Sequence, residues 1–119
     1  MDRLVRAFKN SMRAFVRLSR SETAFQQELA LFVVAFPVGW WLAGSWSGYG
    51  ILLASILFLI VVEVLNTGIE AACNAVSRDF DIDIQLAKDC GSLAVLLAMV
   101  LVAAVWGFAA VEAWRGVPV

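Results

Sequence analysis

The feature that most constrains this chain is a run of 34 residues, from Leu29 to Val62, that contains no charged side chain. A membrane-spanning helix needs about 20 apolar residues, so this run is too long for one span. It breaks at residues 44–50, where glycine and serine alternate with aromatic residues, a pattern typical of a turn at a membrane interface. Two spanning helices, over 26–45 and 49–75, are therefore predicted.

A second uncharged run covers the 22 residues from Cys90 to Val111 and predicts a third spanning helix over 88–112. Composition agrees, because 62% of the 119 residues are hydrophobic and only 16% are charged. A soluble domain of this size would carry more charge on its surface. The predicted fold is an all-α integral membrane protein, with residues 1–119 forming a single membrane domain.

The segment 3–21 before the first span carries six of the nine cationic residues of the chain. At about 100° per residue these six side chains fall within an arc of roughly 120°, opposite an apolar face. The segment predicts an amphipathic surface helix in the headgroup layer of an anionic membrane. Positive charge beside a first span stays cytoplasmic, which places the N-terminus and the connection 77–88 inside the cell. The six are Arg3, Arg6, Lys9, Arg13, Arg17 and Arg20. A net charge of −1 indicates no nucleic-acid partner.

The second predicted span ends with three polar residues, Glu63, Asn66 and Glu70. Their spacing of three and four residues places them within roughly 60° on one helical face. A carboxylate inside a span costs several kcal/mol unless it is paired or faces a polar cavity. The purely structural interpretation is that these groups only join packed helices, as a lone amide often does. Two like charges on one face favour the alternative, a site that binds a cation.

Further polar residues flank the first and third spans on the same predicted side: Glu22, Glu28, Lys88 and Asp89. Several carboxylates without histidine favour a hard cation such as Mg²⁺, and a nearby lysine suits a phosphate. The absence of histidine also leaves only carboxylates or lysine as a general base and makes a zinc site with the two cysteines improbable. Phosphoryl transfer fits these residues, although no glycine-rich phosphate loop is present.

Three stretches of the sequence resemble the prokaryotic diacylglycerol kinase family, the small three-span membrane kinases of bacteria. They are Glu-Thr-Ala-Phe-Gln-Gln-Glu at 22–28, Glu-Val-Leu-Asn-Thr-Gly-Ile-Glu-Ala at 63–71, and Ala-Lys-Asp-Cys-Gly-Ser-Leu-Ala-Val at 87–95. The resemblance implies a homotrimer in the bacterial inner membrane, with active sites between subunits. It also implies that Mg-ATP phosphorylates diacylglycerol to phosphatidic acid.

The resemblance assigns a role to each matching residue of this chain. Glu63 would be the general base for the lipid hydroxyl, and Glu22 and Glu70 would hold the metal. The residues implied on the ATP side are Arg3, Glu22, Asn66, Glu70, Asp79, Lys88 and Asp89. Those implied on the lipid side are Ala24, Phe25, Glu28, Trp41, Glu63, Ser92 and Trp106.

The chain departs from the family pattern on the nucleotide side. Asn74 stands where the family usually has an Asp, and Asn10 stands where a Tyr is found. Asp79-Phe80-Asp81 replaces a more usual Glu-Tyr-His or Glu-His-His. The metal and base carboxylates match the pattern.

Three other functions stay open at this stage. An undecaprenol kinase would use the same machinery on a polyprenyl alcohol. A non-catalytic membrane assembly protein would use the carboxylates for stability or oligomerisation alone. A proton or cation transporter subunit would need carboxylates near the bilayer centre, whereas Glu63 and Glu70 lie toward one end of their span.

Overall fold

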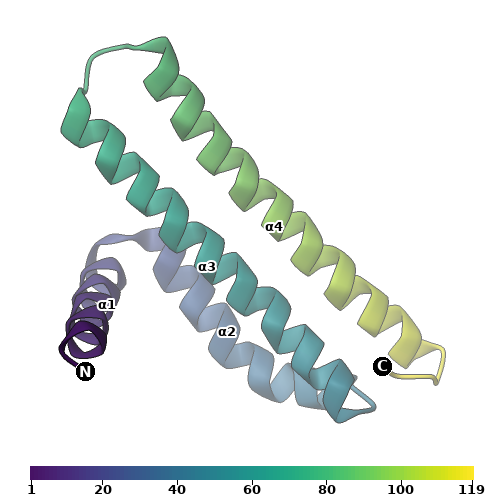
Figure 1. Cartoon of the computed structure of the whole chain (residues 1–119). Helices are drawn as coiled ribbons and strands as arrows, with labels where there is room; N and C mark the ends of the chain where they lie inside the picture. Colours follow the sequence, from purple (N-terminus) through teal and green to yellow (C-terminus); the bar gives the residue numbers. More distant parts are fainter.

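The computed structural model describes the whole chain, residues 1–119, as four helices without strands (Figure 1). They are α1 (Asp2–Ser21), α2 (Thr23–Leu42), α3 (Trp46–Val76) and α4 (Ile82–Trp114). The last three are long and apolar enough to cross a membrane. The predicted all-α membrane fold, with one helix ahead of three spanning helices, is confirmed.

Local capping sets helix boundaries that the charge pattern alone did not reveal. Ser45 caps α3, because its Oγ accepts the Gly48 N–H at 3.0 Å, so the helix begins at Trp46 rather than 49. Asp81 caps α4 through the N–H groups of Asp83 and Ile84, at 2.9 and 3.2 Å. As a result, α4 begins at Ile82, a turn and a half before the predicted start at 88.

The helices α3 and α4 form a long antiparallel pair, and α2 lies beside only part of α3 (Figure 1). The 20 residues of α2 span about 30 Å, which equals the hydrocarbon thickness of a bilayer. The 31 residues of α3 and 33 of α4 span about 46 and 50 Å. The pair therefore projects beyond α2 at the end that carries residues 77–81, the loop end. The opposite end, with residues 43–45 and the C-terminal segment, is the turn end.

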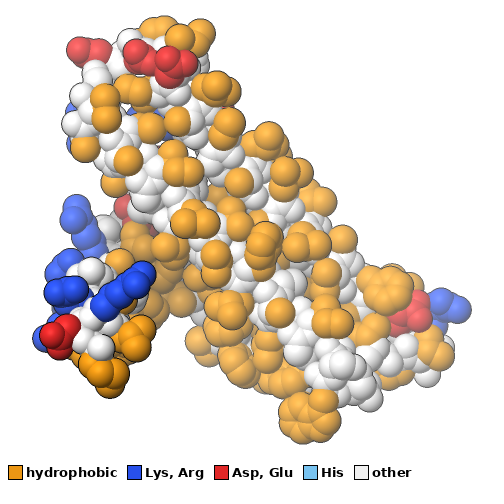
Figure 2. Space-filling view, viewed as in Figure 1, with side chains coloured by type: hydrophobic (Ala, Val, Ile, Leu, Met, Phe, Trp, Pro, Cys, Tyr) orange, Lys and Arg blue, Asp and Glu red, His pale blue; other side chains and the backbone are white.

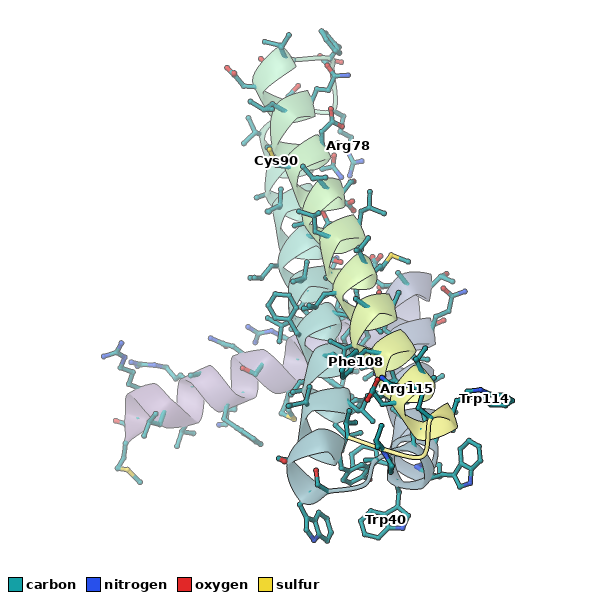
Figure 3. All side chains as sticks on the ribbon, turned by 90° about the vertical axis from the view of Figure 1, so that its right-hand side faces the viewer. Trp40, Arg78, Cys90, Phe108, Trp114 and Arg115 are labelled. Atoms are coloured by element: carbon teal, nitrogen blue, oxygen red, sulfur yellow. The ribbon has the colours of Figure 1, made fainter.

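The helix α1 runs across the direction of α3 and α4 at about the level where α2 begins (Figure 3). It has no buried residue, and it contacts α2 at the corner through Phe15 and Phe25, whose rings lie 5.7 Å apart. Its cationic side chains gather on one side and its apolar side chains on the other (Figure 2). This geometry fits a helix lying in the plane of a membrane surface.

The interior is small for a chain of this length. Its central cluster consists of Phe25, Ala35, Ile56 and Ile60, from α2 and α3. Only 14 of 119 residues are buried, and apolar side chains cover the flanks of α3 and α4 (Figure 2). An apolar surface of this extent is suited to lipid or to other membrane helices, and not to water.

Aromatic side chains and the C-terminal segment close the turn end. Trp40, Trp46 and Tyr49 pack together, with the two indole rings 5.0 Å apart. The Gly44 N–H donates to the Val119 carbonyl oxygen, so residues 116–119 fold back onto the turn between α2 and α3. Trp40, Trp114 and Arg115 are all found at this end in Figure 3.

Candidate active site

Glu63 and Asn66 are buried in α3 at the level where α2 begins, with only 7% and 9% of their surface exposed. Helical spacing places them on the same face, one turn apart. The Thr67 hydroxyl donates to the backbone carbonyl of Glu63 at 3.0 Å, whereas no side chain of the protein donates to the Glu63 carboxylate. A buried carboxylate is thus held on a rigid helix without a partner in its own chain.

The Asn66 side chain contacts the next turn of α3 and the facing helix α4. Its Nδ2 donates to Glu70 Oε1 across 3.4 Å, a long hydrogen bond, and its Oδ1 is buried without a partner. Gly91 of α4 packs directly against that oxygen, and a Cβ at this position would collide with it. The close approach of α4 therefore depends on a glycine at position 91.

Two more carboxylates reach this region from the start of α2. Glu63 experiences charge repulsion from Glu70 and Glu22, and Glu28 experiences it from Glu63. One oxygen of Glu28 is also buried without a hydrogen-bond partner. The only ion pair in the chain joins Arg115 to Glu112 at the turn end, so none of these four carboxylates is in an ion pair within the chain.

The carboxylates of one chain do not complete a metal site by themselves. No group of three or more carboxylate or cysteine side chains lies close enough to hold a metal ion. Glu22 and Glu70 nevertheless supply hard oxygen donors that are in no ion pair, which is the chemistry that Mg²⁺ requires. The oxygen donors of Glu22 and Glu70 are of the type that Mg²⁺ binds, but one chain supplies fewer of them than a metal site needs.

Polar groups continue along the part of α3 and α4 that projects past α2. The Lys88 Nζ donates to Asn74 Oδ1 at 2.8 Å and thereby links the two helices. Asp89 and Ser92 are exposed on α4, one on either side of Gly91. The polar face thus runs from a buried carboxylate to a projecting lysine over about three helical turns.

A hollow of about 360 Å³ lies beside Glu22, between α1 and α3. Arg17, Ser21, Glu22 and Thr67 give it a polar side. It shares Ala14, Leu18 and Val64 with an apolar groove of about 440 Å³ beneath α1. A polar hollow that continues into an apolar groove can receive a molecule with a polar head and an acyl chain.

Four residues implied by the resemblance lie away from this region in the single chain. Arg3 lies near the N-terminal end of α1, about 28 Å from Glu22 along the axis of this helix. Asp79 lies in the loop after α3, where its N–H donates to the Ser77 hydroxyl at 3.1 Å. Trp41 is 82% exposed at the turn end, and Trp106 packs inside the α3–α4 pair. The remaining implied residues surround the start of α2 or follow the projecting helices.

Two residues of the site were not predicted as functional. Asn74 continues the face of Glu63, Asn66 and Glu70 by four residues, and this spacing is a usable signal in the sequence. Gly91 follows Ala87 by four residues, a small-residue spacing that favours close packing of membrane helices. Its contact with Asn66, however, depends on the register between α3 and α4.

Together, the fold and the polar face describe a class of protein: a helical membrane protein whose carboxylates near the start of α2 are in no ion pair. The chain belongs to the prokaryotic diacylglycerol kinase family, whose sequence profile matches residues 9–110. It is therefore an enzyme of the lipid kinase class.

Curated relatives support this membership along most of the chain. A diacylglycerol kinase of Pseudomonas aeruginosa is 33% identical over 106 residues, which cover 89% of this chain and 86% of the relative. One from Escherichia coli K12 is 29% identical over 104 residues, covering 87% and 85%. One from Haemophilus influenzae is 26% identical over 107 residues, covering 90% and 91%.

Proposed function

We propose that this protein transfers the γ-phosphoryl group of Mg-ATP to diacylglycerol and so forms phosphatidic acid. The observation that carries the proposal is the buried, unpartnered Glu63 on a helix face that continues through Asn66 to Glu70. In a membrane, we expect this face to run from the depth of a lipid hydroxyl to the part of α3 that projects past α2. A lipid and a soluble nucleotide can meet along such a face.

In this proposal Glu63 is the general base. Its carboxylate accepts the proton of the lipid hydroxyl while the hydroxyl oxygen attacks the γ-phosphorus, and the bond to the β–γ bridging oxygen breaks to release ADP. Burial among apolar residues keeps water away from the base and so limits ATP hydrolysis. Ala24, Phe25 and Glu28 would position the lipid beside Glu63.

Glu22 and Glu70 would hold Mg²⁺, and the long hydrogen bond from Asn66 would orient Glu70. When bound, the metal would neutralise charge on the phosphate oxygens. Lys88 adds a cationic phosphate contact from α4, and Asp89 completes the polar layer. Because one chain lacks a third ligand in this region, a homotrimer with sites between subunits suits the arrangement. Arg3, Asp79 and Trp41 would act in such an assembly.

The proposed location is the bacterial inner membrane, crossed three times with the N-terminus in the cytoplasm. The cationic face of α1 supports this orientation, since positive charge beside a first span stays inside. The projecting ends of α3 and α4 would then extend into the cytoplasm, where ATP is present.

The test measures phosphate transfer from labelled ATP to diacylglycerol in mixed micelles. Glu63→Gln should lower the rate by roughly 10²- to 10⁴-fold, because it removes the base and keeps the side-chain volume. Glu112→Gln is the matched control, since Glu112 is paired with Arg115 at the turn end, and it should keep the wild-type rate.

A wild-type protein that phosphorylates undecaprenol but not diacylglycerol would overturn the proposed substrate and keep the kinase. Inactivity on both lipids in a folded preparation would overturn the proposed reaction. Equal rates for Glu63→Gln and wild type would remove the assignment of the base.

A further inference from the structure

The contact between Lys88 and Asn74 is the shortest side-chain hydrogen bond between α3 and α4. Lys88 Nζ lies 2.8 Å from Asn74 Oδ1, whereas the bonds from the Trp106 indole to α3 measure 3.1 and 3.2 Å. Both Lys88 and Asn74 are half-buried. The lysine side chain is therefore held in one direction instead of moving freely in solvent.

The partner of this lysine is a neutral amide. An amide oxygen accepts one N–H of the ammonium group and leaves its charge and two other donors available. No carboxylate lies within ion-pair distance of Lys88, since the only ion pair of the chain is at the turn end. An aspartate at position 74, which the family usually has, would hold the ammonium equally well but cancel its charge.

The place of Asn74 on α3 also separates Lys88 from Glu70. Asn74 follows Glu70 by four residues on the same face, about 6 Å further toward the loop end. Its bond to Lys88 keeps the ammonium at that level and away from the Glu70 carboxylate. Glu70 therefore stays available for a cation, and Lys88 stays available for an anion.

We infer that Asn74 is a positioning residue that holds Lys88 toward the phosphates of ATP without neutralising the charge of the lysine. This inference rests on the proposed function, in which Lys88 contacts the phosphates of ATP. It explains one of the departures from the family pattern as a local gain of positive charge. The protein should bind Mg-ATP more tightly with an amide at position 74 than with a carboxylate.

The test compares Asn74→Asp with wild type. A carboxylate about 6 Å from a phosphate, at an effective dielectric constant between 20 and 80, corresponds to roughly 3- to 100-fold in affinity. Asn74→Asp should therefore raise the KM for Mg-ATP about tenfold. The KM for lipid should stay unchanged, and the resistance to unfolding should stay equal or rise through the new ion pair.

Two control variants separate charge from structure. Ile82→Glu adds the same unit of negative charge at the loop end, on a side chain that is 71% exposed, and should change the KM for Mg-ATP less than twofold. Asn74→Gln keeps a neutral amide oxygen that can accept from Lys88 and should keep the KM within threefold. Binding of a non-hydrolysable Mg-ATP analogue, measured by calorimetry, should weaken only for Asn74→Asp.

An unchanged nucleotide affinity in folded Asn74→Asp would overturn the inference. So would a parallel rise of both KM values together with lower stability, because that pattern identifies Asn74 as a structural link alone. If wild type phosphorylates no lipid, the proposed function fails, and calorimetry still decides whether Asn74 governs nucleotide affinity.

Discussion

The turn end and the loop end of this bundle treat buried polar atoms in opposite ways. At the turn end such atoms are paired inside the chain. The Trp106 Nε1 of α4 donates to the Leu52 carbonyl and the Ser55 hydroxyl of α3, and the buried Ser55 hydroxyl donates to the same carbonyl at 2.7 Å. These bonds connect helices that have few buried side chains, so they belong to the fold.

Around Glu63, further toward the loop end, two buried oxygens lack partners within the chain, although Asn74 and Lys88 beyond them are paired. The unpaired oxygens are Asn66 Oδ1 and one oxygen of Glu28, beside the uncompensated carboxylate of Glu63. An unpaired buried polar atom costs about 1–3 kcal/mol, so folding alone does not account for these groups. Polar groups inside this membrane protein therefore serve two purposes. Paired groups hold helices together, and unpaired groups are suited to a ligand or to a neighbouring subunit.

Replacing Asn66 should give the largest separation between stability and activity. In Asn66→Leu the unpaired buried oxygen is lost and so is the hydrogen bond to Glu70, hence stability should stay equal or rise. The rate of lipid phosphorylation should fall at least 100-fold, which corresponds to about 2.7 kcal/mol of transition-state stabilisation. Unfolding in detergent and the labelled-ATP assay measure the two effects. Full activity of a stable Asn66→Leu protein would contradict the division between the two ends.

Replacing Gly91, which contacts Asn66, should have a smaller effect that lowers both stability and activity. Gly91→Ala places a methyl group against Asn66 Oδ1, so α4 or the amide must move, at a cost of about 1–3 kcal/mol and with reduced activity. Gly107→Ala on the same helix is the control, because a Cβ there meets nothing within 4 Å. Its stability should be unchanged or slightly higher, owing to the better helix propensity of alanine. If both variants behave alike, the register between α3 and α4 is not as described.

The smallest expected effect is at the turn end, in Trp106→Phe. Loss of the indole N–H removes hydrogen bonds to Leu52 and Ser55 and should lower the free energy of unfolding by about 1 kcal/mol. The phosphorylation rate should stay within twofold of wild type. A rise in the KM for lipid at unchanged stability would instead favour the lipid contact implied by the family resemblance.

Much of the fold followed from local patterns. The uncharged runs predicted three spanning helices, and the cationic arc predicted an amphipathic helix before them. The exact helix ends were less accessible, since they depend on single capping residues such as Ser45 and Asp81. The site was predicted in part for the same reason: Glu63, Asn66 and Glu70 share a face through helical periodicity alone.

Which helix faces are polar follows from the sequence alone, because spacing along one helix sets the direction of its side chains. Which residues meet across helices is known only from the packed fold. The contacts of Gly91 with Asn66 and of Lys88 with Asn74 depend on the register between α3 and α4. That register results from the packing of many side chains at once, so it is not encoded in the pattern of either helix.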